Sequence, residues 1–143
     1  MKAALSLLFI GIFLTVFVSC NRKRMVPISP HQYEMRVMKI GKIWKVVDAT
    51  DSTKTKLQVR RKDTIVWTIE GTDAFFQFPD SLFNPVDKQS ILQNGFTKFL
   101  RNGHKLKLKI KDNAPSGIYS YAVFCTADSM FAQGDSPPRI IVK

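Results

Sequence analysis

Cysteine and histidine are the scarcest chemically reactive residues in this 143-residue sequence, with two of each. The cysteines are Cys20 and Cys125, and the histidines are His31 and His104. Their spacing is not that of a zinc site, and no glycine-rich phosphate loop or carboxylate pair stands out. The one pair suited to nucleophilic catalysis is Cys125 with His104, but a nearby Asp128 would raise the pKa of the thiol. The sequence therefore predicts no catalytic residue, no cofactor, no metal and no enzyme.

Acidic residues are also few, with 11 against 22 Lys and Arg, which gives a formal net charge of +11. This excess favours contact with something anionic, such as lipid head groups or an acidic protein. It also serves solubility and protects sheet edges, and the sequence leaves both interpretations open. The hydrophobic content of 45% is that of a globular chain, and the length allows one domain of ordinary size.

Only the start of the sequence carries a long apolar run, over residues 3–18. The run is shorter than the roughly 20 residues that span a bilayer, and it fits the core of a secretory signal. The Phe-Val-Ser-Cys sequence that ends at Cys20 resembles a bacterial lipobox, in which the cysteine is lipidated before cleavage. The resemblance implies a signal peptide over residues 1–19, lipid attachment at Cys20 and a lipidated tether over residues 20–32.

A lipidated Cys20 has two consequences for the rest of the chain. Cys125 has no partner for an internal disulfide, and a free thiol outside the cytoplasm survives best when it is buried. We expect a protein anchored by its N-terminal lipid to the bacterial cell membrane or outer membrane, on the periplasmic side. Its expected partner is an anionic envelope component or an acidic protein, and no nucleic acid is expected, because an exported chain rarely meets it.

Residues 33–143 read as one domain made of short strands. Alternating or β-branched patterns predict about eight of them, over residues 34–40, 43–47, 56–60, 64–69, 74–78, 105–111, 118–125 and 138–143. Residues 91–100 are ambiguous, and a short strand after Gly95 is preferred there. Strand 118–125 is expected to pair back on strand 105–111 through a hairpin at residues 112–117. The sequence therefore predicts an all-β sandwich.

Three stretches resemble the cupredoxins. They are the strand entry at residues 61–67, the tyrosine-containing strand at 114–125 that ends in Cys125, and the closing strand at 139–142. The resemblance implies a cupredoxin-like Greek-key β-sandwich, with Cys125 at the copper thiolate position and Met130 as the candidate axial sulfur. The two expected histidines fall near Asp128 and Ala74, so the resemblance implies a degenerate, metal-free pole formed by Ala74, Cys125, Asp128 and Met130.

Alternating aromatic residues at 74–78 suggest a contact surface beside that pole. Phe75 points away from the core that Phe76 and Phe78 share, and Phe83 follows in a loop, so Phe75 and Phe83 are the candidate contact residues. The alternative is that the connection at 80–90 folds over them. The preferred hypothesis is a lipid-anchored, non-catalytic binding or structural module.

Two other hypotheses remain open at this point. The first is a copper-binding or electron-transfer protein with an unusual site of Cys125, Met130 and His104. The second is an immunoglobulin-like domain of a larger surface assembly, which strand order would distinguish from a cupredoxin-like sandwich.

Overall fold

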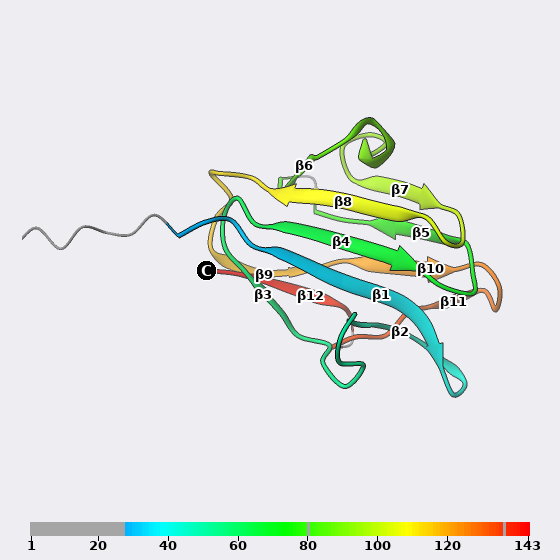
Figure 1. Ribbon diagram of the computed structural model, residues 1–143. Helices are drawn as coiled ribbons and strands as arrows, with labels where there is room; N and C mark the ends of the chain where they lie inside the picture. Colours follow the sequence, from blue (N-terminus) through cyan, green and yellow to red (C-terminus); the bar gives the residue numbers. More distant parts are fainter. Residues whose placement is uncertain (1–27, 80, 136) are drawn as a thin grey trace, which may run out of the picture.

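The computed structural model describes residues 28–79, 81–135 and 137–143, which form twelve strands and one short 3-10 helix (Figure 1). The predicted signal peptide, Cys20 and residues 20–27 of the predicted tether lie outside the described residues. In chain order, the elements are β1 (Gln32–Ile40), β2 (Ile43–Asp48), β3 (Leu57–Val59), β4 (Thr64–Ile69), β5 (Ala74–Gln77), β6 (Phe83–Pro85), η1 (Lys88–Ser90), β7 (Thr97–Leu100), β8 (Lys105–Ile110), β9 (Gly117–Ser120), β10 (Ala122–Cys125), β11 (Met130–Phe131) and β12 (Arg139–Val142).

One layer is a five-stranded sheet in the order β2-β1-β4-β8-β6. Alternation places the apolar residues of β8 on the core face and its lysines on the outer face, since successive side chains of a strand point to opposite sides. β4 lies in the middle of this sheet, which explains its dense β-branched sequence. It pairs in parallel with β1 and antiparallel with β8.

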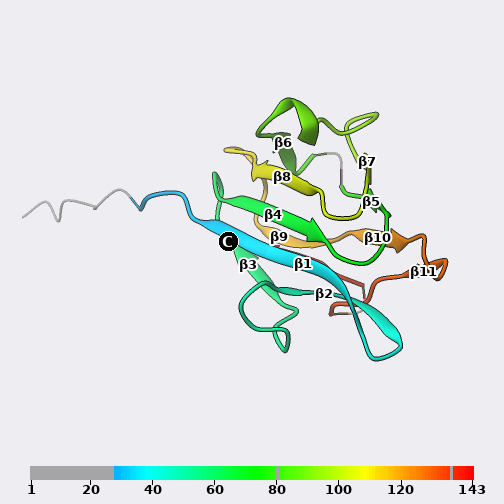
Figure 2. The ribbon, with the colours of Figure 1, turned by 45° about the vertical axis from the view of Figure 1, so that its right-hand side comes forward.

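The second layer consists of a four-stranded sheet, β11-β10-β5-β7, and a three-stranded sheet, β3-β12-β9. β9 and β10 are consecutive, separated by the single residue Tyr121, so one stretch of chain contributes to both sheets. Figures 1 and 2 show the five-stranded sheet lying over the strands of these two sheets. The described residues therefore form a β-sandwich.

Trp67 is the centre of an aromatic core between the layers. Its ring lies 5.1 to 6.1 Å, between centroids, from four aromatic rings, and its Nε1 donates a hydrogen bond of 3.2 Å to the Tyr121 hydroxyl. The four rings are those of Phe76, Phe78, Phe83 and Tyr121. Burial raises the pKa of Tyr121 far above its ordinary value. Tyr121 is therefore a neutral core residue.

The predicted exposure of Phe83 is wrong. Its side chain is only 5% exposed, because β6 pairs with β8 and turns Phe83 toward the core, where its ring lies 5.0 Å from that of Phe78. The sequence shows no strand pattern at residues 83–85, so the region looks like an irregular loop. Phe83 is a packing residue and is removed from the candidate contact surface.

Most of the predicted strands are present, and the preferred strand after Gly95 is β7. The predicted hairpin between residues 105–111 and 118–125 is wrong, because β8 pairs with β4 and β6, whereas β9 and β10 lie in the other layer. The 112–117 connection therefore passes from one layer of the sandwich to the other. The five-stranded order, with its internal parallel β1–β4 pair, also differs from the antiparallel A-B-E-D sheet of an immunoglobulin domain.

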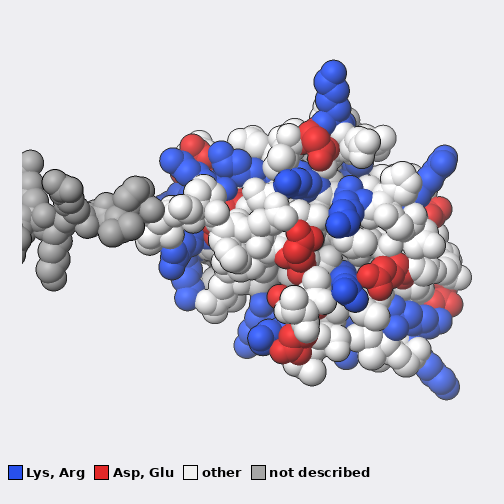
Figure 3. Space-filling model, in the orientation of Figure 1, with Lys and Arg blue, Asp and Glu red and all other residues white. Residues whose placement is uncertain are grey.

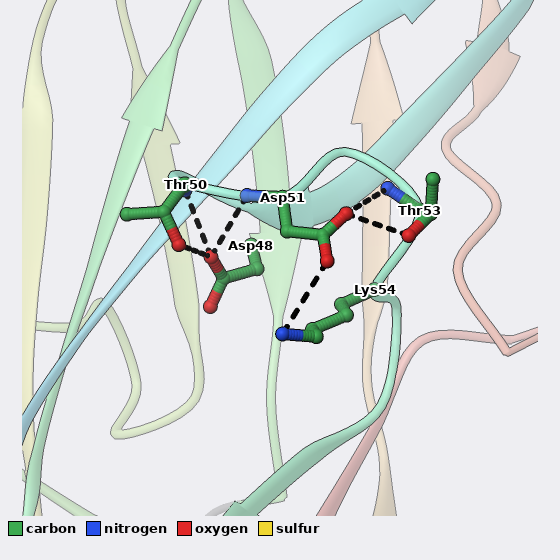
Figure 4. Close-up of polar contacts among 5 residues, drawn as sticks. All are labelled: Asp48, Thr50, Asp51, Thr53 and Lys54. Atoms are coloured by element: carbon green, nitrogen blue, oxygen red, sulfur yellow. Dashed lines mark hydrogen bonds and ion pairs between the residues drawn. The ribbon is translucent and has the colours of Figure 1, made fainter.

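The loop between β2 and β3 is closed by its own side chains (Figure 4). Asp48 Oδ1 accepts hydrogen bonds from Thr50 N, Thr50 Oγ1 and Asp51 N, at 2.8, 2.6 and 3.1 Å. Asp51 accepts in the same way from Thr53, and its other oxygen lies 3.3 Å from Lys54 Nζ. The Thr50 hydroxyl is the first cause of a lowered pKa at Asp48. These carboxylates are used to hold the turn.

Among the described residues, no helix is long and apolar enough to cross a membrane.

Candidate functional site

Cys125 is the last residue of β10 and is fully buried. Its register partners are Ala74 in β5, which is also fully buried, and Met130 in β11. Burial, followed by the negative charge of Asp128, raises the pKa of the Cys125 thiol to about 11. The thiol is therefore protonated at neutral pH, whereas both metal ligation and nucleophilic attack need the thiolate.

Asp128 joins the loop after Cys125 to the β1–β2 hairpin. Its Oδ2 accepts a hydrogen bond of 2.8 Å from Lys39 Nζ and one of 2.6 Å from Trp44 Nε1. The Lys39 contact, and then the Trp44 contact, hold the pKa of Asp128 below its ordinary value. Lys39 and Trp44 face each other across β1 and β2. At this position, where the resemblance expects a histidine, the chain has a carboxylate with a structural role.

The segment before β5 completes the pole with hydrogen bonds between loops. Thr72 Oγ1 accepts from Ala127 N at 3.1 Å, and the Asp73 carbonyl accepts from Thr126 N at 3.0 Å. Asp73 Oδ1 accepts from Asn102 N at 2.8 Å. No buried side-chain nitrogen or oxygen in the described part of the chain lacks a partner. The polar groups at this pole are thus satisfied by the protein itself.

His104 does not complete a ligand set with Cys125 and Met130. It lies in the turn between β7 and β8 and lines a hollow with Glu34, Val66 and Lys107 on the outer face of the five-stranded sheet. Cys125, in contrast, lies in the core. Within the described ranges, no group of three or more His, Cys, Asp or Glu side chains could hold a metal ion. The residues present therefore do not fit the two-imidazole, one-thiolate site of blue copper.

Four phenylalanines form a row across the outer face of the four-stranded sheet. Phe131 in β11 is the register partner of Phe124 in β10, Phe124 is the partner of Phe75 in β5, and Phe75 is the partner of Phe99 in β7. We call these residues the phenylalanine row. The ring centroids of Phe75 and Phe99 are 4.7 Å apart, and those of Phe124 and Phe131 are 5.2 Å apart.

The phenylalanine row is open to solvent. Phe75 is 50% exposed, Phe99 37% and Phe131 64%, while Phe124 is partly buried. The neighbouring residues Ala74, Leu100 and Cys125 are buried because they alternate to the core side of the same strands. At about 4.8 Å between strands, the row spans roughly 14 Å of the sheet. It is a continuous aromatic surface, rather than scattered exposed residues.

Sequence reasoning found one member of this row, Phe75, and missed the other three. Phe99 lies in the ambiguous stretch at 91–100, and Phe131 lies in what looks like a loop. The alternation of Val123, Phe124 and Cys125 does place Phe124 opposite a buried cysteine. The register of β10 with β11 and β5 brings Phe131, Phe124 and Phe75 together, and the register of β5 with β7 adds Phe99. These pairings join distant parts of the chain.

No protein-family model and no curated protein matches the chain. Among solved structures, it is similar to a reduced Cu(I) form of an amicyanin variant at pH 4, with 12% identity over 82% of this chain and 87% of that chain and a TM-score of 0.42. It is also similar to a reduced form of another amicyanin variant, with 13% identity over 82% and 87% and a TM-score of 0.43. A purple cupredoxin from Nitrosopumilus maritimus is 12% identical over 78% of this chain and 99% of that chain, with a TM-score of 0.43.

These similarities assign neither a ligand nor an activity to this chain. The β-sandwich is shown by the strand pairing of the chain itself. The metal named for the first amicyanin variant belongs to that protein.

Proposed function

We propose that this chain is a lipid-anchored, non-catalytic binding module of the bacterial cell envelope, with a metal-free cupredoxin-like domain. The observation that supports it most strongly is the phenylalanine row on the outer face of the four-stranded sheet. Aromatic residues are enriched in protein interfaces, and contiguous exposed apolar patches mark contact surfaces. The lipid anchor rests on the sequence around Cys20 and on the apolar run before it.

The partner that we propose for the row is an acidic protein. Covering a phenylalanine that is about half exposed contributes roughly half of the 1.5–3 kcal/mol of a fully exposed one, on the order of 1 kcal/mol each, and the four together provide a central apolar anchor. The net charge of +11, to which the predicted signal peptide contributes only Lys2, attracts a negatively charged protein and speeds its association. The apolar row then provides contact area, and the charge provides preference for the partner.

The degenerate pole supports a non-catalytic role. The Cys125 thiol is buried with a raised pKa, and Asp128 is held by Lys39 and Trp44. Each group that could do chemistry there is already used for packing or for hydrogen bonds. The phenylalanine row lies on the same sheet but on its opposite face, where solvent reaches it.

Co-purification after gentle crosslinking in membranes tests this function. The full chain is compared with Phe75→Ser, Phe99→Ser and the matched control Ile118→Ser, which replaces an equally apolar, 64% exposed residue on the three-stranded sheet. We expect the full chain and Ile118→Ser to retain an acidic partner that both phenylalanine variants lose. Binding of the purified partner should weaken as salt increases.

Two results would count against the proposal. One is a partner that the phenylalanine variants retain as well as the control does. The other is a partner that binds with no dependence on salt, because an acidic protein attracted by this charge must respond to screening. Thermal unfolding of each variant accompanies the experiment, so that lost binding is separated from lost folding.

A further inference from the structure

We propose that the end of the sandwich from which β1 starts lies directly against an anionic membrane surface. This inference rests on the membrane anchoring in the proposed function and adds an orientation and a lipid class. The surface is formed by Arg60, Arg61 and Lys62, in the turn between β3 and β4, and by Lys143. We call these four residues the cationic end.

The cationic end is compact and exposed. All four of its residues are exposed, and Lys143 N donates to the Val59 carbonyl at 3.0 Å, which holds Lys143 beside Arg60. Arg60 and Lys143 line hollows together with Ile28. Figure 3 shows Lys and Arg side chains gathered at the end of the molecule where the described chain begins.

The acidic groups nearby do not cancel this charge. Asp63 is buried, and its two oxygens accept from His31 N at 2.8 Å and from Arg60 N at 2.7 Å. Asp112 lies 3.8 Å from Lys62 Nζ and 3.5 Å from Lys109 Nζ. Lys109 and the four residues of the cationic end together outnumber Asp63 and Asp112 by three charges.

Asp63 also holds the cationic end beside His31, the residue just before β1. His31 N donates to Asp63, and Thr64 N donates to the His31 carbonyl at 2.8 Å, so residue 31 is held on the same turn that carries Arg60 and Lys62. About twelve residues connect Cys20 to β1, and fully extended they reach roughly 40 Å. A lipid at Cys20 therefore holds the cationic end within roughly 40 Å of the bilayer, and the positive charge of that end favours it as the face that docks.

The sequence and one exposed side chain add to the fit. In the sequence, Arg22, Lys23 and Arg24 stand between Cys20 and the described residues, so the proposed tether also carries positive charge close to the lipid. Ile28, which is 73% exposed, lies beside Arg60 and Lys143. Apolar side chains flanked by cations are typical of segments that bind the head-group region of anionic lipid.

This orientation determines how far the phenylalanine row lies from the membrane. β1 and β4 run away from the cationic end, and β10 and β11 lie toward the opposite end of the molecule (Figure 1). Docking on lipid would therefore turn the row toward the aqueous side, where a protein partner can reach it.

Trace acetylation of lysines with mass spectrometry tests the docking. The full chain is reconstituted in vesicles of neutral phosphatidylcholine and in vesicles with about one third phosphatidylglycerol, which supplies the anionic surface. Lys42, in the turn between β1 and β2 at the far end, is the internal control. We expect acetylation of Lys62 and Lys143, relative to Lys42, to fall several-fold on the anionic vesicles and to recover at high salt.

A control variant removes charge without touching the labelled Lys143. Arg60→Gln with Arg61→Gln should restore the acetylation of Lys143 on anionic vesicles to the level seen on neutral ones. Unchanged Lys62-to-Lys42 and Lys143-to-Lys42 ratios between the two kinds of vesicle would overturn the inference. So would protection that is equal on neutral vesicles, because it would have no dependence on lipid charge.

The same samples distinguish a failure of docking from a failure of the lipid anchor. Sedimentation with neutral vesicles reports anchoring, whereas the acetylation ratio reports docking of the cationic end. A chain that sediments with both vesicles but shows no protection retains its anchor and contradicts the docking. A chain that is protected on anionic vesicles but does not sediment with neutral ones supports the docking and contradicts the anchor.

Discussion

Asp128 shows how a carboxylate near a buried thiol can serve the fold. Its carboxylate accepts from Lys39 and Trp44, so it holds the loop after Cys125 against the β1–β2 hairpin. The indole N–H of a buried tryptophan needs an acceptor, and Asp128 supplies it. The carboxylate also makes the neighbouring thiol harder to ionise. Asp128 therefore closes the pole and adds to burial, the larger cause, in raising the pKa of the Cys125 thiol.

Removing the Asp128 carboxylate should lower the stability. Asp128→Ala leaves Trp44 Nε1 without its acceptor, and Asp128→Asn keeps an acceptor oxygen but loses the charge that Lys39 meets. We expect Asp128→Ala to have the lower midpoint in urea, with Asp128→Asn between it and the unmodified chain. Equal midpoints for all three chains would show that these contacts do not stabilise the fold.

The stability contributed by Asp128 should depend on pH in a defined direction. The pKa of Asp128 is lowered in the folded state from 3.8, so its contribution is present above that value and is lost as the pH falls through the folded pKa. The difference in midpoint between the unmodified chain and Asp128→Asn should shrink toward zero in strong acid. A difference that stays constant under acid conditions would contradict the lowered pKa.

Cys125 should behave as a masked thiol. Its pKa of about 11 in the folded state, against 9.0 for a free thiol, predicts slow reaction with a maleimide under mildly alkaline conditions and fast reaction after unfolding. Because the folded pKa is raised, its contribution to stability is intact below pH 9 and is lost as the pH rises through 11. Cys125→Ala should lack this loss, and comparison with it removes the effect of Tyr121. Fast labelling of the folded chain would contradict the burial.

The copper alternative has its own test at Cys125. The two sulfur-bearing residues, Cys125 and Met130, are register partners, but no third ligand joins them in the part of the chain that the structure describes. Isothermal titration with Cu(I) should therefore give the same affinity for the unmodified chain and for Cys125→Ala. Clearly tighter binding by the unmodified chain would restore the metal hypothesis.

At the scale of elements, the turn between β3 and β4 depends on one buried carboxylate. Asp63 caps the backbone N–H groups of His31 and Arg60, which come from two different segments. Asp63→Ala should lower the free energy of unfolding by about 1–3 kcal/mol, because two backbone donors lose the buried carboxylate that accepts from them. Denaturant unfolding measures this. Asp112→Ala is the matched control, with an expected effect within about 0.5 kcal/mol, since Asp112 is exposed.

The strands show where sequence patterns suffice and where they do not. The alternation of Lys and Leu predicts β8, and the β-branched run predicts β4. Burial of one or both faces of a strand produces a local pattern of apolar residues in the sequence. The sheet to which a strand belongs produces no such pattern. Strands β8 and β9 are neighbours in sequence, but they lie in different layers, and the expected hairpin between them is absent from the pairing.

The residues of the candidate site show the same limit: local patterns predict exposure within a strand but not which strands pair. The exposure of Phe75 follows from alternation within β5, and the burial of Phe83 depends on its pairing with β8, far along the chain. The phenylalanine row is a product of register between four strands, so single-sequence reasoning sees only one of its members. Asp128 could be placed near Cys125 by sequence separation, but its contacts with Lys39 and Trp44 bridge more than eighty residues.

At the scale of the whole molecule, the two ends have different surfaces and different proposed roles. The cationic end lies where the chain enters and suits an anionic surface, and the phenylalanine row lies toward the other end on the outer face of a sheet. The aromatic core around Trp67 joins the two layers between them. With the cationic end on the membrane, the domain would hold the phenylalanine row away from the bilayer.

The row should be nearly dispensable for stability. Phe75→Ser removes a half-exposed ring and its cross-strand contact with Phe99, which is worth about 0.2–1 kcal/mol. We therefore expect only a small fall in the thermal midpoint. A fall as large as that of a core substitution would assign Phe75 to the core and remove it from the contact surface.

Site-specific photo-crosslinking is the most direct test of the central claim that the phenylalanine row is the contact surface. A photoreactive phenylalanine analogue is placed at position 131 in one sample and at position 118 in another, because Phe131 and Ile118 are equally exposed but lie on different sheets. We expect the analogue at 131 to capture one acidic protein in native membranes and the analogue at 118 to capture none. Capture of the same protein from both positions, or from position 118 alone, would contradict the claim.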